Sequence, residues 1–562
     1  MRARALPLFV LALICLAPPT VASAAGGEAG AITAANRDPK VLREEAENGP
    51  LAPVANKVDG HWEVGYFSDG KELALVLVDP ASGQVTESWT GYQVAWKMAR
   101  GYSGAFGHKL NAPYVFLPLC ALFLLGLVDW RRWRRVANLD LLVLLGFGVS
   151  HFFFNQAEIG VSVPLQYPVL VYLLARALWI GFRGVGEGLR PVWPAGWLII
   201  AALFLLGFRV GLNVADSGAI DVGYASVVGA DRIAHGEPIY DNFPTDVSQG
   251  DTYGPVNYVA YVPFERIWPW SGSWDDLPAA HGAAVFFDVA TFLLLIVLAL
   301  RIRPGPAGRH LAAILAFAWT AYPYTAYPLE SNSNDTLVAL LLVATLLLLA
   351  RPALRGVTAA LATWTKFAPG LLVPMLLTYR PEEEGQPKRP LPRVAGRSGV
   401  FARSLRGRRP HLPDRTRGPI TFALTFLLVT VVMMIWPIIN PGLPTFYERT
   451  LAFQSGRTSP FSIWGQVPSL EPLRVALLIA TVALAIGLAF VPRRKSLVQV
   501  AALGAALLIA LQLTMHHWFY LYVVWFFPLL LVALAAVRPA ATAAVEGPAP
   551  SPARRTRPVP MR

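Results

Sequence analysis

Apolar runs of about 20 residues recur between Pro113 and Val537, and they constrain the fold more than any other feature of the sequence. A helix of this length crosses the hydrocarbon core of a bilayer. The composition agrees, since 55% of residues are hydrophobic and 15% are charged, whereas soluble domains carry roughly 25% charged residues. We therefore predict an all-α polytopic membrane protein with about eleven spans. The predicted spans are residues 113–130, 138–154, 164–183, 194–213, 281–302, 309–327, 335–350, 419–438, 473–491, 496–514 and 517–537.

The N-terminal part precedes these spans and differs from them in composition. Arg2 and Arg4, an apolar run at 5–17 and the small residues Ala22-Ser23-Ala24 indicate a secretory signal segment at 1–24. Residues 25–111 have an ordinary, water-soluble composition and are therefore expected outside the membrane. Their patterning predicts a helix at 39–47 and strands at 61–68, 72–78 and 84–89, with turns at Asp69-Gly70 and Ser82-Gly83.

These elements predict a small extracytoplasmic α+β domain, which weakly resembles a PepSY-type module. The remaining chain divides into accessory transmembrane helices at 112–192, a membrane core at 193–537 and a basic cytoplasmic tail at 538–562.

Basic residues gather in short clusters between the apolar runs, as at 131–135 and 493–495. The net charge of +13 could suggest nucleic acid as a partner, but clusters in this position are typical of cytoplasmic loops. We therefore expect membrane lipids and no nucleic acid around this chain. The expected location is the plasma membrane, with the N-terminal domain and the large polar loops extracytoplasmic.

One apolar segment, at 356–379, conflicts with this topology if it is counted as a full span. It would then place residues 380–417 outside, although they hold 11 Lys/Arg against four acids. A break at Pro369-Gly370 would instead give a re-entrant hairpin that enters and leaves on the cytoplasmic side. Lys366 would lie near its tip, where a charge needs a role or a buried partner.

The predicted outside surface carries the polar residues that are candidates for chemistry. Its longest loop, at 214–280, holds ten Asp/Glu against two arginines, with aromatic residues and prolines between them. A carboxylate, cations and histidines in one layer are the groups needed for transfer from an anionic phosphate leaving group. The candidates in chain order are Asp216, Asp221, Tyr224, Tyr253, Asn332, Asn334, Lys366, Arg457, Trp464, His516 and His517.

The order of these motifs resembles a known family. Asp221-Val-Gly-Tyr224, then Gly236-Glu-Pro-Ile-Tyr240-Asp241 and Tyr253-Gly-Pro, resemble the GT-C superfamily of membrane glycosyltransferases. Within it, the pattern is similar to glycosyltransferase family 87, which includes polyprenol-phosphate-mannose-dependent α-mannosyltransferases. The later matches are Asn332-Ser-Asn334-Asp335, Thr365-Lys366-Phe-Ala-Pro369-Gly-Leu-Leu-Val-Pro374, residues 454–464 and His516-His517.

The resemblance implies an inverting hexosyltransferase. It would move a sugar, mannose by analogy, from a polyprenyl-phosphate donor in the outer leaflet to a lipid or cell-envelope glycan acceptor. The general base of the family falls on Asp221, and Asp216 remains its rival because it lies only five residues earlier.

The other candidates form the predicted substrate-binding set. Arg457, His516 and His517 could neutralise the donor phosphate. Tyr224, Tyr253 and Trp464 could stack on sugar faces or pack against the isoprenoid, and Asn332, Asn334 and Lys366 complete the set. The prediction includes no cofactor, because the sequence has no nucleotide-phosphate loop and no clear metal cluster; participation of a divalent ion is left open.

The alternative from another class is a transporter or flippase of a lipid-linked sugar. Transporters place ionisable residues at the bilayer midplane and show internal repeats. Arg176, Asp288 and Lys366 are the ionisable residues within apolar segments that fit this alternative, but no convincing repeat accompanies them.

The re-entrant hypothesis predicts that residues 380–417 face the cytoplasm. A single cysteine introduced at Ser404 should therefore resist an impermeant thiol reagent in intact cells and react after permeabilisation. Labelling in intact cells would contradict the hypothesis.

Overall fold

The computed structural model describes residues 27–58, 60–95, 100, 107–382, 414–457 and 459–537. The chain divides into two compact units, Met1–Arg100 and Gly101–Arg562. The predicted signal segment, most of the basic loop at 380–417 and the predicted tail at 538–562 lie outside the described residues.

The first unit is a four-stranded antiparallel sheet with helices packed on it. Its elements are α1 (Glu28–Ala35), α2 (Pro39–Asn48), β1 (Ala52–Val58), β2 (His61–Ser68), β3 (Lys71–Val78), β4 (Val85–Thr90) and α3 (Tyr92–Ala95), with strand order β1-β2-β3-β4. The core joins Val64 and Val76 of the sheet to Ala31 and Val41 of the helices. This arrangement is α+β, as the sequence predicts.

The sequence does not predict β1, and the composition of that strand explains why. Pro53 and Asn56 are depleted in strands, and proline is tolerated because β1 lies at the edge of the sheet. The β2–β3 turn is as expected, since Asp69 and Gly70 adopt φ 50° and 75°, the left-handed conformations of a tight hairpin.

The second unit is helical. Its helices in the first half are α4 (Pro113–Leu127), α5 (Val136–Leu145), α6 (Phe147–Asn155), α7 (Ile159–Arg183), α8 (Ala195–Asp216), α9 (Asp221–His235), α10 (Pro255–Ile267), α11 (Pro278–Ile302), α12 (Gly305–Ala321) and α13 (Pro323–Glu330). Those in the second half are α14 (Asp335–Leu347), α15 (Pro352–Thr365), α16 (Val373–Leu377), α17 (Asp414–Ile439), α18 (Leu443–Tyr447), α19 (Phe453–Gly456), α20 (Ile463–Gln466), α21 (Glu471–Phe490), α22 (Leu497–Gln512) and α23 (Val523–Ala536).

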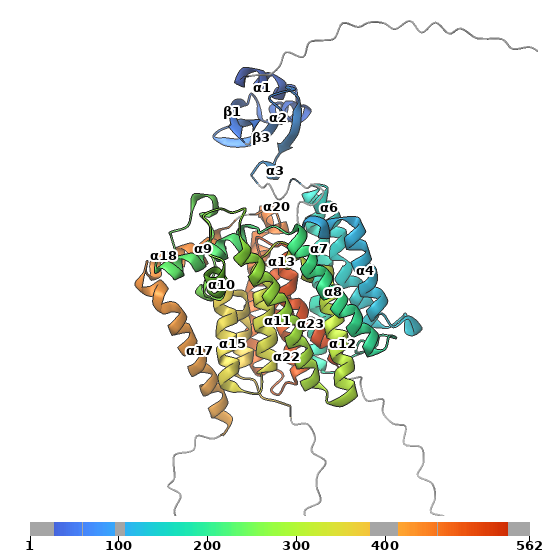
Figure 1. The fold of residues 1–562 in the computed structure, drawn as a ribbon. Helices are drawn as coiled ribbons and strands as arrows, with labels where there is room; N and C mark the ends of the chain where they lie inside the picture. The colour runs from blue at the N-terminus through green and yellow to red at the C-terminus, as the bar shows by residue number, and fades with distance from the viewer. Residues whose placement is uncertain are drawn as a thin grey trace, which may run out of the picture. The chain divides into compact units, whose positions relative to one another are not determined.

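Six segments among the described residues are long and apolar enough to cross a membrane: Val136–Asn155, Ile159–Arg183, Ala195–Asp216, Pro278–Ile302, Arg417–Ile439 and Pro468–Phe490. Shorter apolar helices include α4, α14, α22 and α23. The predicted class, a mostly helical membrane protein, is confirmed, and the number of spans stays a prediction. Long helices such as α11, α12, α15 and α17 form the body of this unit, while α9, α18 and α20 lie at one end of it (Figure 1).

The segment predicted to be re-entrant is divided in two, but its break differs from the prediction. Helix α15 ends at Thr365, and a 3₁₀ turn (Ala368–Leu372) leads into α16, so the break falls at Lys366-Phe367 rather than at Pro369-Gly370. The first positions of a helix leave their N–H groups unused, so proline, which has no N–H, is tolerated there. Pro369 is the second residue of the 3₁₀ turn and therefore does not end α15.

The two ends of this segment meet, as a hairpin requires. The Arg355 guanidinium, near the start of α15, lies 5.1 Å from the ring centroid of Tyr379, just beyond α16. Lys366 is therefore at the tip.

Two ion pairs join charged residues within the apolar helices. Arg176 contacts Asp140 at 2.7 Å, and Arg209 contacts Asp288 at 3.0 Å. An isolated charge is costly in this environment, whereas a paired charge can hold two helices together. The pairing of Arg176 and Asp288 therefore explains these charges structurally, and they do not by themselves favour a transporter.

Candidate active site

The turn between α13 and α14 organises the end of the helical unit where the candidate residues lie. Asn332 adopts a left-handed conformation, φ 47°, and is fully buried. The Asn213 amide on α8 donates to Asn332 Oδ1 at 2.8 Å and to the Leu329 carbonyl at 2.6 Å, while the Asn332 amide donates to Ser217 Oγ at 3.0 Å. These bonds tie the end of α8 to the turn.

The same turn positions Asp221. Backbone bonds join Gly218 N to the Glu330 carbonyl at 3.2 Å and Ile220 N to the Ser331 carbonyl at 3.1 Å, so the chain reaches α9 in a fixed conformation. A Cβ atom at Gly223 would lie 2.3 Å from the Asn332 carbonyl oxygen. The glycine in Asp221-Val-Gly-Tyr224 therefore lets the first turn of α9 rest on the α13–α14 turn.

Buried amides extend this framework to α10. Asn334 donates to Asn257 Oδ1 at 2.7 Å, and Asn257 donates to Ser226 Oγ at 3.0 Å. Asn332 and Asn334 are both fully buried. Their contacts therefore make these two predicted substrate-binding residues part of the hydrogen-bonded framework that supports Asp221.

A buried ion pair joins three helices beside this framework. Lys366 Nζ, at the break after α15, lies 2.5 Å from Oδ1 of Asp335, the first residue of α14. The Trp525 indole of α23 donates to the same oxygen at 2.7 Å, and Ser333 Oγ donates to Oδ2 at 2.9 Å. The contacts with Lys366 and Trp525 thus stabilise the meeting point of α14, α15 and α23, and Ser333 orients the carboxylate from the preceding turn.

Aromatic rings surround the Lys366 ammonium. It lies 5.2 Å from the ring centroid of Tyr253, 5.7 Å from that of Tyr522 and 5.2 Å from that of Trp525, distances typical of cation–π contacts. Tyr253 reaches this position because Gly254 packs on the Trp364 carbonyl, which a Cβ atom would approach to 2.0 Å.

The Asp221 carboxylate lies in the electrostatic field of this cluster. Its side chain is exposed to solvent, yet loss of hydration against the surrounding protein raises its pKa above the ordinary aspartate value, and Asp335 adds to the rise. Arg457 and Lys366 oppose it, as does the bond that Asp221 Oδ1 accepts from Val222 N at 2.9 Å. A solvent-reachable carboxylate with a raised pKa is suited to act as a general base.

Arg457 and His517 complete the cluster. Burial, followed by the charges of Arg457 and Lys366, lowers the pKa of His517 well below its usual value, so this side chain is a neutral imidazole. Its Nδ1 lies 2.9 Å from Ser459 Oγ, and its ring lies 6.2 Å from that of Tyr522. The structure thus brings together Asp221, Tyr253, Lys366, Arg457 and His517.

The other predicted site residues have different partners. Asp216 contacts Lys109 Nζ at 3.3 Å, the Tyr224 hydroxyl donates to Asp246 at 3.2 Å, and His516 Nε2 lies 3.0 Å from Glu471. Trp464 is buried and donates to the Leu513 carbonyl at 3.0 Å. None of these contacts involves the cluster around Lys366.

Three residues of the cluster were not predicted as site residues from the sequence: Asp335, Tyr522 and Trp525. Asp335 stands in the Asn332-Ser-Asn334-Asp335 motif, and its place at the start of an apolar run was the available signal. Tyr522 and Trp525 lie in an aromatic-rich run that resembles an interfacial belt, so only the fold distinguishes them.

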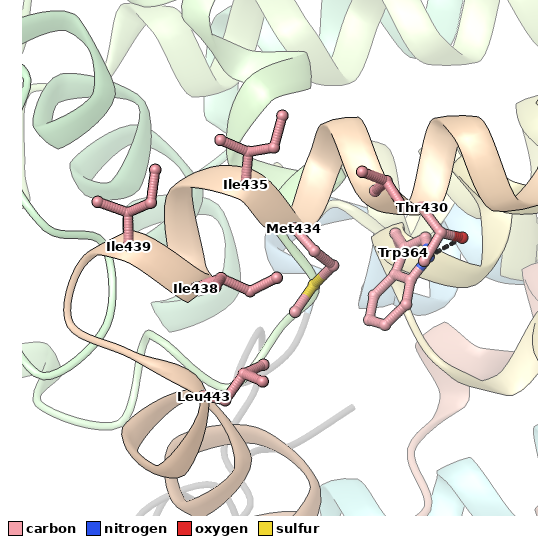
Figure 2. Close-up of a pocket in the computed structure, with 8 residues that line it drawn as sticks. Trp364, Thr430, Met434, Ile435, Ile438, Ile439 and Leu443 are labelled. Atoms are coloured by element: carbon pink, nitrogen blue, oxygen red, sulfur yellow. Dashed lines mark hydrogen bonds between the residues drawn. The ribbon is translucent and has the colours of Figure 1, made fainter.

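An apolar groove lies between α15 and α17 (Figure 2). Its volume is ≈ 380 Å³, and it is lined by Trp364, Thr430, Val431, Met434, Ile435, Ile438, Ile439 and Leu443. The hydroxyl of Thr430 accepts a bond from the Trp364 indole at 2.9 Å, so these two polar groups satisfy each other. Trp364 and Met434 pack in the same group of apolar side chains as Tyr253. This packing connects the groove to the Tyr253 ring, which faces Lys366.

The fold and site therefore define a helical membrane protein with a carboxylate and cations gathered at one end of its helices. A model of glycosyltransferase family 87 matches residues 252–384, the part of the chain that contributes Tyr253, Asp335 and Lys366. The resemblance to that family is confirmed over this segment and indicates a glycosyltransferase, with a sugar donor and an acceptor as its substrates. No curated protein and no solved structure matches the chain.

The Lys366–Asp335 pair generates a stability prediction. Lys366→Met leaves a buried carboxylate without its cation, which typically costs about 3–5 kcal/mol, so the variant should melt at a clearly lower temperature in detergent. Lys366→Met combined with Asp335→Asn removes the charge, keeps an acceptor for Trp525 and should recover most of the loss.

The matched control is Lys109→Met, which removes a lysine from an exposed ion pair with Asp216. Exposed pairs contribute about 0–1 kcal/mol, so this variant should melt close to the parent. Equal melting of Lys366→Met and the parent would contradict the structural role.

Proposed function

We propose that this protein transfers a hexose, and we favour mannose, from a polyprenyl-phosphate donor to a lipid or cell-envelope glycan acceptor. The transfer inverts the configuration at the sugar carbon. The observation that supports this most directly is that the charges of Arg457 and Lys366 act on the Asp221 carboxylate, where both favour its charged form. A base for the acceptor and cations for a phosphate leaving group are the two requirements of this reaction.

The proposed reaction has one displacement step. Asp221 takes the proton of the acceptor hydroxyl, and the oxygen attacks the anomeric carbon on the face opposite the phosphate. The bond between that carbon and the phosphate oxygen breaks, and its electron pair leaves with the polyprenyl phosphate. The raised pKa of Asp221 makes this carboxylate a stronger base than an ordinary aspartate.

The cations of the cluster differ in their availability to a phosphate. Lys366 is held by Asp335 at 2.5 Å and is buried, so its charge is largely matched within the protein. Arg457 is half-buried, and we assign it the main contact with the leaving phosphate. His517, as a neutral imidazole, can donate one hydrogen bond to that phosphate from Nε2 when Nδ1 accepts from Ser459.

The aromatic side chains provide surfaces for the sugar. We propose that Tyr253 and Tyr522, both half-buried, present ring faces to the donor sugar at the cluster. For Tyr224, Asn332, Asn334, Trp464 and His516 the observed contacts favour positioning of the site over direct contact with substrate.

The apolar groove supports a donor that carries a long hydrocarbon chain. It opens along α17, whose apolar surface is largely exposed in the protein and suited to contact lipid. Through Trp364 and Met434 the groove adjoins the packing around Tyr253. A lipid donor also agrees with our proposal that the site faces outward at the plasma membrane, where nucleotide sugars are absent.

Asparagine substitutions distinguish the two candidate bases. Asp221→Asn should lower the transfer rate about 10²–10⁴-fold, because the amide keeps the shape and cannot accept the proton. Asp216→Asn should retain most activity, since Asp216 is paired with Lys109. Both variants should melt like the parent, and initial rates with a radiolabelled polyprenyl-phosphate sugar would measure the effect.

The pH dependence provides a second signature of the same base. A base acts when deprotonated, so kcat/KM of the parent should fall as pH drops through the pKa of Asp221, which lies above the usual value of about 3.9. The residual activity of Asp221→Asn should lack this acid limb. Loss of the limb in Asp216→Asn instead would move the base to Asp216.

Chain-length dependence tests the groove. Ile438→Trp should fill part of it and raise KM about tenfold for a donor with a full-length polyprenyl chain, because each CH₂ kept out of the groove loses about 0.8 kcal/mol. KM for a donor with a ten-carbon chain should change little, since so short a chain buries little of itself there.

Leu428→Trp is the matched control, because Leu428 is on α17 and 62% exposed but does not line the groove. It should leave KM unchanged for both donors. Equal effects of Ile438→Trp on the long and short donors would contradict binding of the chain in this groove.

A further inference from the structure

A second ion pair lies between the segment that carries Arg457 and the loop that carries Tyr253. Arg449 Nε contacts Asp251 Oδ2 at 2.6 Å, and Arg449 Nη2 contacts Oδ1 at 2.7 Å, which makes the pair bidentate. The same Nη2 donates to the Ser248 carbonyl. Asp251 has no exposed surface, so its carboxylate lies in the interior, and the half-buried Arg449 reaches it from the surface.

The Asp251 side of the pair leads directly to the cluster. Asp251 Oδ2 also accepts from Asp241 N at 2.7 Å. Two residues further on, Tyr253 has its backbone held at both ends, since its N–H donates to the Tyr258 hydroxyl at 3.3 Å and its carbonyl accepts from the Tyr240 hydroxyl at 3.0 Å. Through Asp241 and the adjacent Tyr240, Asp251 is thus linked to the backbone of the residue whose ring faces Lys366.

The Arg449 side leads to Arg457 through continuous helical structure. Arg449 lies in a π-helical turn (Glu448–Ala452) between α18 and α19, and Arg457 caps the end of α19. Phe446 of α18 packs edge-on against Tyr240 at 4.9 Å, so α18 and the loop share an apolar contact beside the ion pair. π-helical turns are rare and are frequently found at functional sites.

We propose that the Asp251–Arg449 ion pair is a positioning element that fixes Arg457 relative to Tyr253, across the place where the donor phosphate binds. The inference rests on the proposed function for the identity of that ligand. The bidentate geometry is what makes the contact directional, because two parallel bonds set the orientation as well as the distance. Lysine preserves the charge but cannot form two such bonds.

The test is a mutant cycle that measures binding of undecaprenyl monophosphate to the full-length protein in detergent. Arg449→Lys should weaken binding about tenfold, the loss expected when one charged hydrogen bond is misplaced. In an Arg457→Ala background, Arg449→Lys should change binding by less than about twofold, because residues that act through one another are not additive.

Arg135→Lys is the matched control. Arg135 also bonds a buried aspartate, Asp129 at 3.2 Å, and a backbone carbonyl, that of Gly188 at 2.7 Å, but these partners have no contact with the cluster. It should lower thermal stability to an extent similar to Arg449→Lys and leave binding of the lipid phosphate unchanged.

The outcomes separate this inference from the proposed function. Equal weakening by Arg449→Lys in the parent and in the Arg457→Ala background, or no weakening in the parent, would overturn the positioning role. A parent that binds the lipid phosphate but transfers no sugar would contradict the proposed function and leave the cycle valid. A parent that does not bind it would overturn both.

Discussion

The buried contact between Lys366 and Asp335 is the interaction on which the rest of this end of the protein depends. It joins the tip of the α15–α16 hairpin to the start of α14, and the Trp525 indole adds α23 through the same carboxylate oxygen. Charges in an apolar interior persist only when they are paired and hydrogen-bonded, which explains why one short contact gathers a tryptophan, a serine and two tyrosine rings around it. The cluster that faces Asp221 is assembled around this pair.

A second framework holds the carboxylate that we propose as the base. The amides of Asn213, Asn257 and Asn334 connect α8, α9, α10 and the α13–α14 turn. None of them needs to touch a substrate to matter, since each fixes a backbone segment next to Asp221. The residues of the motif Asn332-Ser-Asn334-Asp335 therefore have different tasks. The two asparagines belong to the framework of buried amides, and the aspartate anchors Lys366.

Much of this architecture could be predicted from the sequence because long apolar runs and β-hairpin patterns are local signals. The strand at 61–68 and the division of the 356–379 segment follow from such signals. The choice of Asp221, the first residue of α9, comes instead from the resemblance to family 87, and its role as the base stays a prediction. Strand β1 could not be predicted, since Pro53 and Asn56 conceal it. The pairing of His516 with Glu471 rather than with the cluster, and the presence of Tyr522 and Trp525 in it, depend on tertiary contacts between segments that are distant in sequence.

We propose a lipid phosphate as the sugar donor, and the rest of the mechanism depends on it. The most direct measurement incubates the purified full-length protein, in vesicles containing extracted envelope lipids as acceptors, with the same radiolabelled mannose supplied either as polyprenyl-phosphate mannose or as a nucleotide sugar. We expect transfer from the lipid donor, release of polyprenyl phosphate and a product of inverted anomeric configuration. Transfer from the nucleotide sugar alone, or retention of configuration with the lipid donor, would contradict this proposal.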